Sequence, residues 1–249
     1  MSNALKKADF QEGEWCAYLN HSHPFTVSSI AEVFDGIAGF DKTLKNDRRS
    51  LVKLGALSGF NVVAKQPRDK NDRKWMRVLS LFSTAEARKT FNTLLEFKEK
   101  GIESLTPLCL LERKRFGMVF DSWLLYEYRE GRESDRSHLK EIVKHLSLLH
   151  SHGYRHEDPN FGNFLIDENG TLFLIDCKGK ARSGRFSDYY DFLLFEGRCG
   201  FTREEVEALI DVDRSSLAYW QAQFYRGYIR LRTKWKVLMR RKRSKDQHL

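Results

Sequence analysis

Apolar and polar positions alternate in short runs from residue 41 to about residue 128, and this pattern predicts a β-rich region. Turn-forming residues separate the runs, and Ser58-Gly59 is suited to close a hairpin between two of them. Residues 1–40 predict one more strand and a short amphipathic helix around Val27–Phe34, without indicating a function. We expect the strands at EWCAYLN (14–20), KTLKN (42–46), SLVKLGAL (50–57), FNVVAKQP (60–67), LTPLCLLERK (105–114) and FGMVFDSWLLYEYREG (116–131).

Apolar residues recur at helical spacing in two longer segments. The segment 80–102 places Phe91, Leu94, Leu95 and Phe97 near one face and stops at Gly101, a typical C-terminal glycine. The segment 138–153 ends at Gly153 and is predicted to bury Leu139, Ile142, Val143, Leu146 and Leu149. The apolar runs FLID and TLFLID then follow, and the Asn169-Gly170 between them is a strong signal for a tight hairpin.

Composition indicates a folded, soluble protein. The chain has 249 residues, of which 41% are hydrophobic and 31% are charged, with only four prolines. No apolar run approaches the roughly 20 residues that span a bilayer, and the first ten residues lack the apolar core of a secretion signal, so we expect a cytoplasmic protein. The four cysteines are far apart and form no C-x-x-C pair, which favours idle thiols over a zinc site or a disulfide framework.

The segment RHEDPNFGNFLID (155–167) concentrates polar residues just after the second predicted helix. It contains His156-x-Asp158-x4-Asn163, and Asp176 follows thirteen residues after the asparagine, beyond the predicted hairpin. These spacings match the catalytic loop and the metal-binding aspartate of protein kinases. A polar turn whose Asp and Asn side chains only cap backbone groups is the simpler alternative.

Phosphoryl transfer explains why these residue types would occur together. Mg²⁺ prefers oxygen ligands such as a carboxylate and an amide carbonyl, which Asp176 and Asn163 would supply. A second carboxylate must orient the acceptor hydroxyl and accept its proton, and Asp158 fits that general-base role. His156 would hold the loop by hydrogen bonds or packing.

A kinase site also needs a lysine on an upstream strand and a glutamate on the next helix. Lys65 ends the run VVAK, and Glu86 follows 21 residues later in the first turns of the predicted helix. We expect these two to form the pair that anchors the nucleotide phosphates, with Glu96 as the reserve partner. A glycine-rich loop is missing, because the preceding hairpin contains only Gly55 and Gly59.

Departures from the protein-kinase pattern argue against a protein acceptor. Glu157 replaces the arginine that binds a phosphorylated activation loop in many protein kinases. Asp176-Cys177-Lys178 replaces Asp-Phe-Gly, and no Ala-Pro-Glu follows. Only eleven residues separate Asp176 from Asp188, which leaves little chain to build a platform for a peptide.

Several segments together resemble the lipopolysaccharide core heptose kinases of Gram-negative bacteria, in particular the heptose(II) kinase branch. They are VVAK, RKWMRVLSLFSTAEARKTF, KEKGIESLTPLCLLERKRFGMVFDSWLLYEYREG, HEDPNFGNFLID and SDYYDFLLF, and they cover most of the chain from about residue 14 to 200.

This resemblance implies an α+β, two-lobed protein-kinase-like fold with a small β-rich N-lobe and a mainly helical C-lobe. It implies ATP and Mg²⁺ as cofactors and transfer of phosphate to a heptose hydroxyl of the inner core, on the cytoplasmic side of the inner membrane. Carried onto this chain, Asp158 is the general base, Asn163 and Asp176 are the metal ligands, and Lys65 with Glu86 anchors the phosphates. Asp188 and Asp191 either brace the catalytic loop or are surface acids.

We accordingly divide the chain into four parts. Residues 1–40 are an N-terminal extension, 41–128 form the N-lobe that anchors the nucleotide phosphates, and 129–225 form the C-lobe with the catalytic loop and metal site. Residues 226–249 form a basic, amphipathic C-terminal helix or tail.

The C-terminal segment carries the net charge of +9, because residues 226–249 hold ten Lys or Arg and a single acid, Asp246. Trp220, Phe224, Tyr228, Leu231, Trp235 and Leu238 recur every three or four residues and predict one apolar face. Such a helix can lie in a membrane interface, so we expect an anionic inner-membrane surface as a partner of Arg226–Lys245. A last helix packed on the C-lobe, with a solvated basic end, is the alternative.

Three other functions compete with a lipopolysaccharide kinase. A nucleic-acid binder is disfavoured because the body of the chain is neutral and lacks a base-stacking platform. A catalytically inactive kinase-like scaffold is disfavoured by the retained Lys65, Asp158, Asn163 and Asp176. A small-molecule kinase of the aminoglycoside or choline type would use the same residues and is the alternative enzyme.

Overall fold

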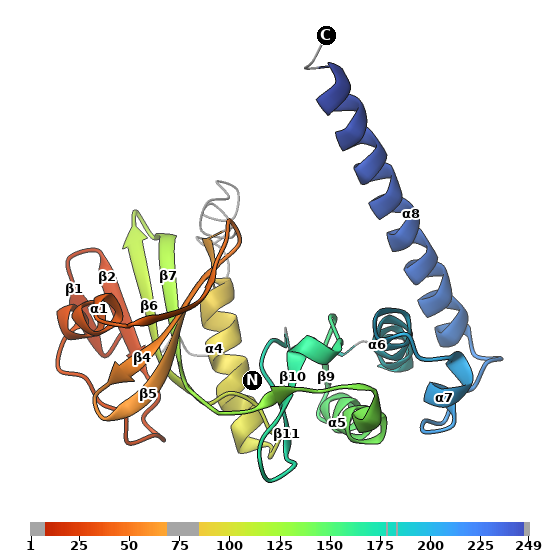
Figure 1. Cartoon of the computed structure of the whole chain (residues 1–249), viewed down its shortest axis with the longest axis horizontal. Helices are drawn as coiled ribbons and strands as arrows, with labels where there is room; N and C mark the ends of the chain where they lie inside the picture. The colour runs from red at the N-terminus through yellow and green to blue at the C-terminus, as the bar shows by residue number, and fades with distance from the viewer. Residues whose placement is uncertain (1–7, 69–84, 178, 183, 247–249) are drawn as a thin grey trace. The chain divides into compact units, whose positions relative to one another are not determined.

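The computed structural model describes residues 8–68, 85–177, 179–182 and 184–246. The chain divides into two compact units, Met1–Glu130 and Gly131–Leu249. The first is built around a sheet and the second is mainly helical (Figure 1), which confirms the predicted α+β fold with a β-rich N-lobe and a helical C-lobe. No helix in these residues is both long and apolar enough to cross a membrane.

A seven-stranded antiparallel sheet forms the N-terminal unit, in the order β1-β2-β6-β7-β5-β4-β3. The strands are β1 (Phe10–Glu12), β2 (Trp15–Leu19), β3 (Lys42–Asn46), β4 (Leu51–Leu57), β5 (Phe60–Gln66), β6 (Pro107–Arg115) and β7 (Met118–Glu127). Within the described residues of this unit, two helices accompany the strands, α1 (Ile30–Ala38) and α4 (Glu86–Glu99). Ser58 and Gly59 both have positive φ angles, 51° and 80°, which suit the predicted tight turn between β4 and β5.

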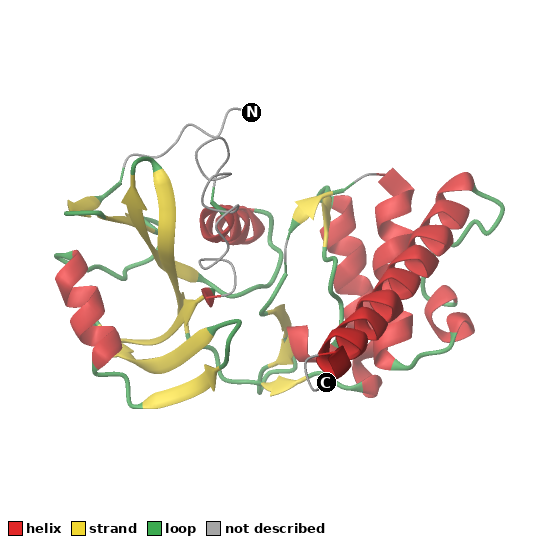
Figure 2. Ribbon diagram, turned by 90° about the horizontal axis from the view of Figure 1, so that it is seen from above, coloured by secondary structure: helices red, strands yellow, loops and turns green. Residues whose placement is uncertain are grey.

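The two helices lie on opposite faces of this sheet (Figure 2). Helix α1 begins after Ser29, whose hydroxyl accepts a hydrogen bond from the Glu32 N–H, and it packs Ile30, Val33 and Ile37 into the main core of the unit. Since β1, β2 and α1 all come from residues 1–40, the segment that the sequence set apart as an extension contributes two strands and a covering helix to the sheet unit.

The strand register decides which face of the sheet carries Lys65. Lys65 is paired with Leu124, Leu124 with Leu110, and Leu110 with Tyr18, and directly paired residues point to the same face. The ring of Tyr18 lies under the guanidinium of Arg88 from α4, at 3.8 Å. Lys65 therefore lies on the face of the sheet that α4 covers.

The C-terminal unit contains a short three-stranded sheet, a two-stranded sheet and four α-helices within the described residues. In chain order its elements are β8 (Arg132–Glu133), η1 (Arg136–His138), α5 (Leu139–Ser151), β9 (Tyr154–Arg155), η2 (Phe161–Asn163), β10 (Phe164–Ile166), β11 (Leu172–Leu174), β12 (Lys180–Ala181), α6 (Gly184–Cys199), α7 (Arg203–Glu207) and α8 (Leu217–Asp246).

Helix α5 delivers the chain to the polar loop as predicted. Four of its predicted core residues are buried and Leu139 is half-buried; the buried ones are Ile142, Val143, Leu146 and Leu149. Gly153, with φ 83°, follows the helix in a conformation that glycine adopts without strain. The hairpin β10–β11 is also confirmed, with Phe164 opposite Leu174.

Helix α8 packs on α6 through a small face near its N-terminus. Tyr219 and Ala222 join a buried cluster with Tyr189, Tyr190 and Leu193 of α6. One turn later, the buried Arg226 reaches Glu196, with both of its terminal nitrogens 3.3 Å from Oε1. A Cβ at Gly197 would lie 2.7 Å from the Arg226 guanidinium, so a larger residue there would require the end of the Arg226 side chain to shift.

Parts of the sequence prediction lie outside the described residues. These include residues 80–84 of the predicted helix, the charged segment Lys70–Lys74 and most of RKWMRVLSLFSTAEARKTF. The four cysteines are free thiols, as the sequence indicated, and Cys16, Cys109 and Cys177 are buried. Burial raises the pKa of the Cys109 thiol to about 12 and also raises that of Cys177, which makes both poor nucleophiles.

Candidate active site

A buried carboxylate anchors the polar loop that begins at His156. Asp191 of α6 is fully buried and accepts hydrogen bonds from the backbone N–H groups of His156 (2.6 Å) and Glu157 (2.8 Å). His150 of α5 lies 3.0 Å from the same carboxylate through Nε2. Of the two possibilities left open by the sequence, the structure thus favours a loop brace for Asp191. Asp188 instead pairs with Arg182, at 2.6 Å from Nε.

His156 is a structural residue of the loop. Its side chain is fully buried, its ring lies 5.2 Å from that of Phe164, and its Nδ1 is 3.3 Å from the backbone N–H of Asp158. Burial lowers the pKa of His156 to about 4, so the ring is neutral at pH 7 and Nδ1 can accept this hydrogen bond. The predicted loop-holding contacts of His156 are therefore present.

Glu157 adopts a backbone conformation that is unusual for a residue with a side chain, with φ 67°. Such strain persists where the surroundings enforce it, and here Asp191 binds the Glu157 N–H. The Glu157 side chain contacts Arg155 (2.8 Å) and Lys180 of β12 (2.9 Å). The segment after Asp176 is thus tied to the loop by a permanent carboxylate, where a regulated protein kinase would use an arginine and a phosphate.

Asp158 presents its carboxylate at the surface of the loop, with its side chain 41% exposed. Its backbone carbonyl accepts hydrogen bonds from the side-chain amides of Asn160 (3.0 Å) and Asn163 (2.7 Å). The guanidinium of Arg198, from the last turn of α6, contacts the carboxylate. The loop therefore fixes the backbone of Asp158 and leaves its carboxylate partly exposed.

Asn163 and Asp176 lie at the same end of the β10–β11 hairpin. Asn163 directly precedes β10, and its carbonyl accepts a hydrogen bond from the N–H of Ile175, at 3.1 Å. Asp176 is the next residue and is exposed. Because the Asn163 amide nitrogen is bound to the Asp158 carbonyl, its side-chain oxygen is left as a ligand atom.

An oxygen pair of this kind suits a hard divalent cation such as Mg²⁺. No group of three or more His, Cys, Asp or Glu able to hold a metal occurs among the described residues. An ion held by Asn163 and Asp176 would thus complete its coordination with water and nucleotide phosphates, as Mg²⁺ commonly does.

Lys65 and Glu86 both belong to the N-terminal unit, and both are half-buried. Helix α4 lies over the face of the sheet that carries Lys65. Helix α4 is fastened there by Arg88, whose guanidinium forms a buried ion pair with Glu112 of β6. Glu112 lies on the same face as Leu110, two residues away on the strand, and also contacts Lys114 at 3.2 Å. This network sets the position of the first turns of α4, where Glu86 lies.

Sequence reasoning missed three residues that shape these regions: Arg198 beside Asp158, and the buried pair Arg88–Glu112. Glu112 occupies an apolar strand, LCLLERK, and Arg88 lies three residues before Phe91 on the predicted apolar face of its helix. A charged residue inside each apolar pattern was therefore the available signal. Nothing in the local sequence of Arg198 indicates its partner, which lies forty residues earlier.

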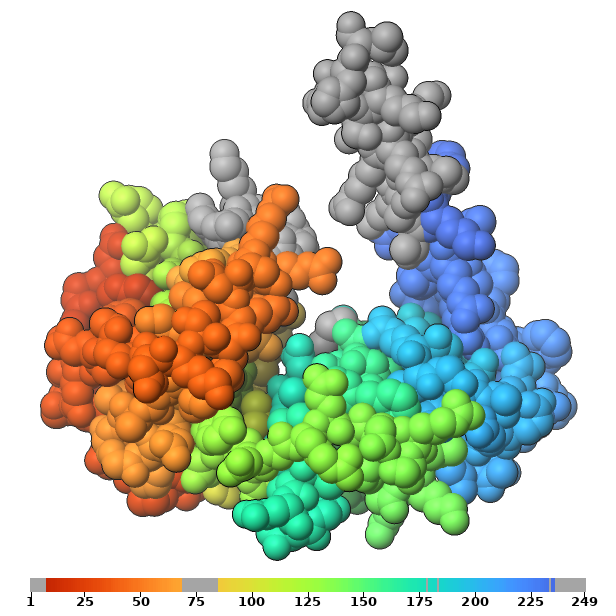
Figure 3. All heavy atoms as spheres, viewed as in Figure 1, coloured from red at the N-terminus to blue at the C-terminus, as the bar shows by residue number. Residues whose placement is uncertain are grey.

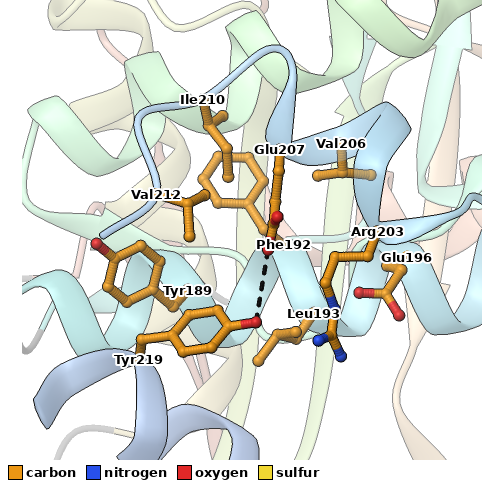
Figure 4. Close-up of a pocket in the computed structure, with 10 residues that line it drawn as sticks. All are labelled: Tyr189, Phe192, Leu193, Glu196, Arg203, Val206, Glu207, Ile210, Val212 and Tyr219. Carbon is orange, nitrogen blue, oxygen red and sulfur yellow. Dashed lines mark hydrogen bonds between the residues drawn. The ribbon is translucent and has the colours of Figure 1, made fainter. Parts of the chain in front are cut away.

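A small cavity in the C-terminal unit lies between α6, α7 and the start of α8 (Figure 4). Its wall is mostly apolar, with a hydrogen bond of 3.5 Å from the Tyr219 hydroxyl to Glu207. A volume of about 20 Å³ holds about one water molecule. This cavity is a packing feature and is too small for a nucleotide or a sugar.

Comparisons with known proteins find partial similarity to proteins named as kinases. It is 29% identical to the lipopolysaccharide core heptose(II) kinase WaaY of Escherichia coli K12 over 126 residues, which are 48% of this chain and 53% of that protein. It is 30% identical to the 3-deoxy-D-manno-octulosonic acid kinase of Xylella fastidiosa over 97 residues, 34% of this chain and 38% of that protein. Part of the chain is thus similar in sequence to two proteins that are named as kinases of sugars.

These relationships are partial, since the matched region spans about half the length of the first of these relatives and less of the second. A 60-residue segment is also 38% identical to the maternal embryonic leucine zipper kinase of Danio rerio, over 24% of this chain and 9% of that protein. Among solved structures, WaaP in complex with acyl carrier protein aligns with a TM-score of 0.44 and 14% identity, over 84% of this chain and 90% of that one. No family model matches the chain.

Proposed function

We propose that this protein is an ATP-dependent phosphotransferase that phosphorylates a heptose hydroxyl in the inner core of lipopolysaccharide. Two observations support the proposal together. The loop 156–163 is braced by Asp191, with the Asp158 side chain partly exposed and the Asn163 amide nitrogen bound to the Asp158 carbonyl, and one matched relative is named as a heptose(II) kinase. The geometry of the loop supports the reaction type, and the name of the relative supports the choice of acceptor.

Each residue has a defined task in this reaction. Asp158 orients the acceptor hydroxyl and accepts its proton as the hydroxyl oxygen bonds to the γ-phosphorus of ATP and the bond from that phosphorus to the ADP leaving group breaks. Arg198 holds the Asp158 carboxylate in position, and Asp191 with Asn163 fixes the backbone around it. Asn163 and Asp176 would hold Mg²⁺, and Lys65, paired with Glu86, would bind the nucleotide phosphates. When bound, Mg²⁺ neutralises negative charge on the transferred phosphoryl group.

We further propose that the enzyme meets its lipid-anchored acceptor at the cytoplasmic face of the inner membrane. Arg226 is buried and paired with Glu196, so the nine basic residues of Arg230–Lys245 would then draw the protein to an anionic surface by long-range attraction. This attraction weakens with salt, because exposed charges are screened over about 8 Å at physiological ionic strength.

The test is transfer of label from γ-labelled ATP, with Mg²⁺, to purified lipopolysaccharide that lacks phosphate on its core heptoses. We expect label in the lipopolysaccharide and none in an aminoglycoside, choline or a protein mixture. Asp158→Asn should lower the transfer rate by about 10³-fold or more, with folding and nucleotide binding retained, because it removes only the proton acceptor. Asp167→Asn, in the exposed hairpin turn, is the matched control and should transfer at the wild-type rate.

Each outcome is informative. Normal transfer by Asp158→Asn would exclude Asp158 as the base. Label in the aminoglycoside or choline alone would replace the acceptor with a small molecule. Bound ATP without transfer to any acceptor would favour a kinase-like scaffold.

A further inference from the structure

Most of the exposed large hydrophobic side chains among the described residues lie on helix α8. Ten large hydrophobic side chains are exposed in those residues, and seven belong to the segment 217–235. Six of them form what we call the α8 stripe: Leu217 (74% exposed), Trp220 (62%), Phe224 (81%), Tyr228 (51%), Leu231 (68%) and Trp235 (69%). Monomeric soluble proteins rarely leave such a contiguous patch in water unless it binds something.

The spacing of the α8 stripe keeps it on one side of a straight helix. The steps are three, four, four, three and four residues, so at about 100° per residue all six positions fall within an arc of about 80°. From Leu217 to Trp235 the stripe is about 27 Å long. It is therefore a narrow, straight band suited to a flat surface.

The stripe is not the face by which α8 packs on its own unit. That face consists of Tyr219, Ala222 and Arg226, which lie on the opposite side of the helical wheel from the stripe and are buried against α6. Figure 3 shows α8, in blue, continuing beyond the side chains of α6 and α7. Folding of the C-terminal unit thus leaves the more apolar side of this helix uncovered, the reverse of an ordinary amphipathic helix.

The charges around the stripe indicate what covers it. No Asp or Glu occurs from Leu217 to Lys245. Arg232 and Lys234 are exposed and lie about 80° to either side of the centre of the stripe. Tryptophan and tyrosine, which contribute three of the six stripe residues, favour the boundary between lipid headgroups and acyl chains. A second copy of the helix would bring two strongly basic segments together, and a nucleic acid would leave the stripe in water.

We propose that the α8 stripe inserts into the headgroup boundary of an anionic lipid bilayer, with the helix axis parallel to the membrane and Arg232 and Lys234 at the lipid phosphates. This deepens the proposed function, on which it rests for its choice of a membrane-bound acceptor. It adds a specific apolar contact to the attraction exerted by the basic segment.

Sedimentation of the full-length protein with vesicles tests this contact. Vesicles of phosphatidylcholine alone are compared with vesicles that also contain phosphatidylglycerol, without ATP or acceptor. We expect binding to the mixed vesicles, and a loss of about tenfold or more in the triple variant Phe224→Ser, Leu231→Ser, Trp235→Ser. Phe116→Ser, which removes an aromatic side chain that is 79% exposed in the β6–β7 turn, is the matched control and should bind as the wild type does.

Two further measurements separate the apolar contact from charge. Arg232→Gln with Lys234→Gln should weaken binding about threefold and reduce its salt dependence. Brominated phosphatidylcholine in the mixed vesicles should quench the tryptophan fluorescence of the wild-type protein, and quenching should fall in Trp235→Phe. Circular dichroism shows whether each variant keeps its helix content.

Wild-type binding by the triple variant, or absence of quenching, would overturn the proposal in favour of charge alone. A wild-type dimer that the triple variant converts to a monomer, without vesicle binding, would assign the stripe to a second copy of the chain. Retention by single-stranded nucleic acid but not by vesicles would also overturn it. Because no outcome depends on transfer of label, failure of the kinase proposal is recognised separately.

Discussion

Both units of the molecule contain a buried carboxylate, and the two are balanced in different ways. Glu112 in the sheet unit is 1% exposed and is matched by cations, Arg88 from α4 and Lys114 on its own strand. Asp191 in the helical unit is fully buried and is matched mainly by hydrogen-bond donors, the N–H groups of His156 and Glu157 and the ring of His150.

The two carboxylates therefore have different roles, which we call a fastening and a template: Glu112 joins two elements, whereas Asp191 sets the path of the backbone. An ion pair between side chains holds two elements together, and a pair of apolar side chains of similar size can often replace it. A carboxylate that binds successive backbone N–H groups fixes the path of the chain itself, including the left-handed conformation of Glu157, and no apolar residue can do so. The sheet unit should therefore tolerate replacement of its buried charges better than the loop tolerates loss of Asp191.

The largest effect is expected for Asp191→Ala. The change leaves one buried and one partly buried N–H donor without an acceptor, so we expect the free energy of unfolding to fall by about 4 kcal/mol. Transfer activity should fall about 10²-fold or more, because Asp158 loses its fixed position. Urea denaturation and the kinase assay measure the two effects.

Asp188→Asn is the control, because the ion-pair partner of Asp188, Arg182, is exposed. This variant should lose less than half as much free energy of unfolding as Asp191→Ala, and equal losses would refute the template role of Asp191.

A smaller effect, on stability, is expected at the other carboxylate. Glu112→Leu leaves the Arg88 guanidinium buried without its partner and should lower the free energy of unfolding by about 3 kcal/mol. The double variant Arg88→Met, Glu112→Leu should recover most of that loss, as measured by urea denaturation. The exposed pair Glu14–Arg115 gives the control, since Glu14→Gln should cost less than about 1 kcal/mol.

If the double variant stays as unstable as Glu112→Leu, the buried pair is more than a fastening and the contrast with Asp191 fails. The double variant would then be expected to lose nucleotide affinity as well, since α4 carries Glu86.

The smallest effect concerns His156 and appears only in acid. Burial lowers the pKa of His156 in the folded protein to about 4, from 6.5 in the unfolded chain, so the folded state favours the neutral ring. The stability that this preference contributes is fully present above pH 6.5. It is lost as the pH falls from 6.5 to about 4, and the loss of stability at pH 4 amounts to about 2–3 kcal/mol. Denaturation between pH 7 and pH 4 measures it.

The variant His156→Phe should be less stable at pH 7, because the Asp158 N–H loses its acceptor, and should lose less stability on acidification than the wild type. A wild-type acid response in this variant would show that another group titrates.

Much of the fold could be predicted because it depends on neighbours in sequence. The alternation of apolar and polar residues predicted the strands around Lys65, and helical spacing predicted α5 with Ile142 and Leu146 inward. The pairs Ser58-Gly59 and Asn169-Gly170 predicted the turns of the two hairpins. The spacing of Asp158, Asn163 and Asp176 was equally readable, and the structure places the three on one loop and its hairpin. Their roles in catalysis stay predictions.

The sequence by itself therefore determined the elements and the group of residues at the loop, because turn chemistry, strand alternation and helical periodicity act over a few residues. Only the tertiary structure decided which side chains those elements meet. It brought Asp191 under a loop thirty-five residues away, Arg198 to Asp158, and Arg88 to Glu112. The apolar stripe of α8 shows the same limit: periodicity revealed that one side of the helix is apolar, but whether that side is buried depends on packing against α6, which left it exposed.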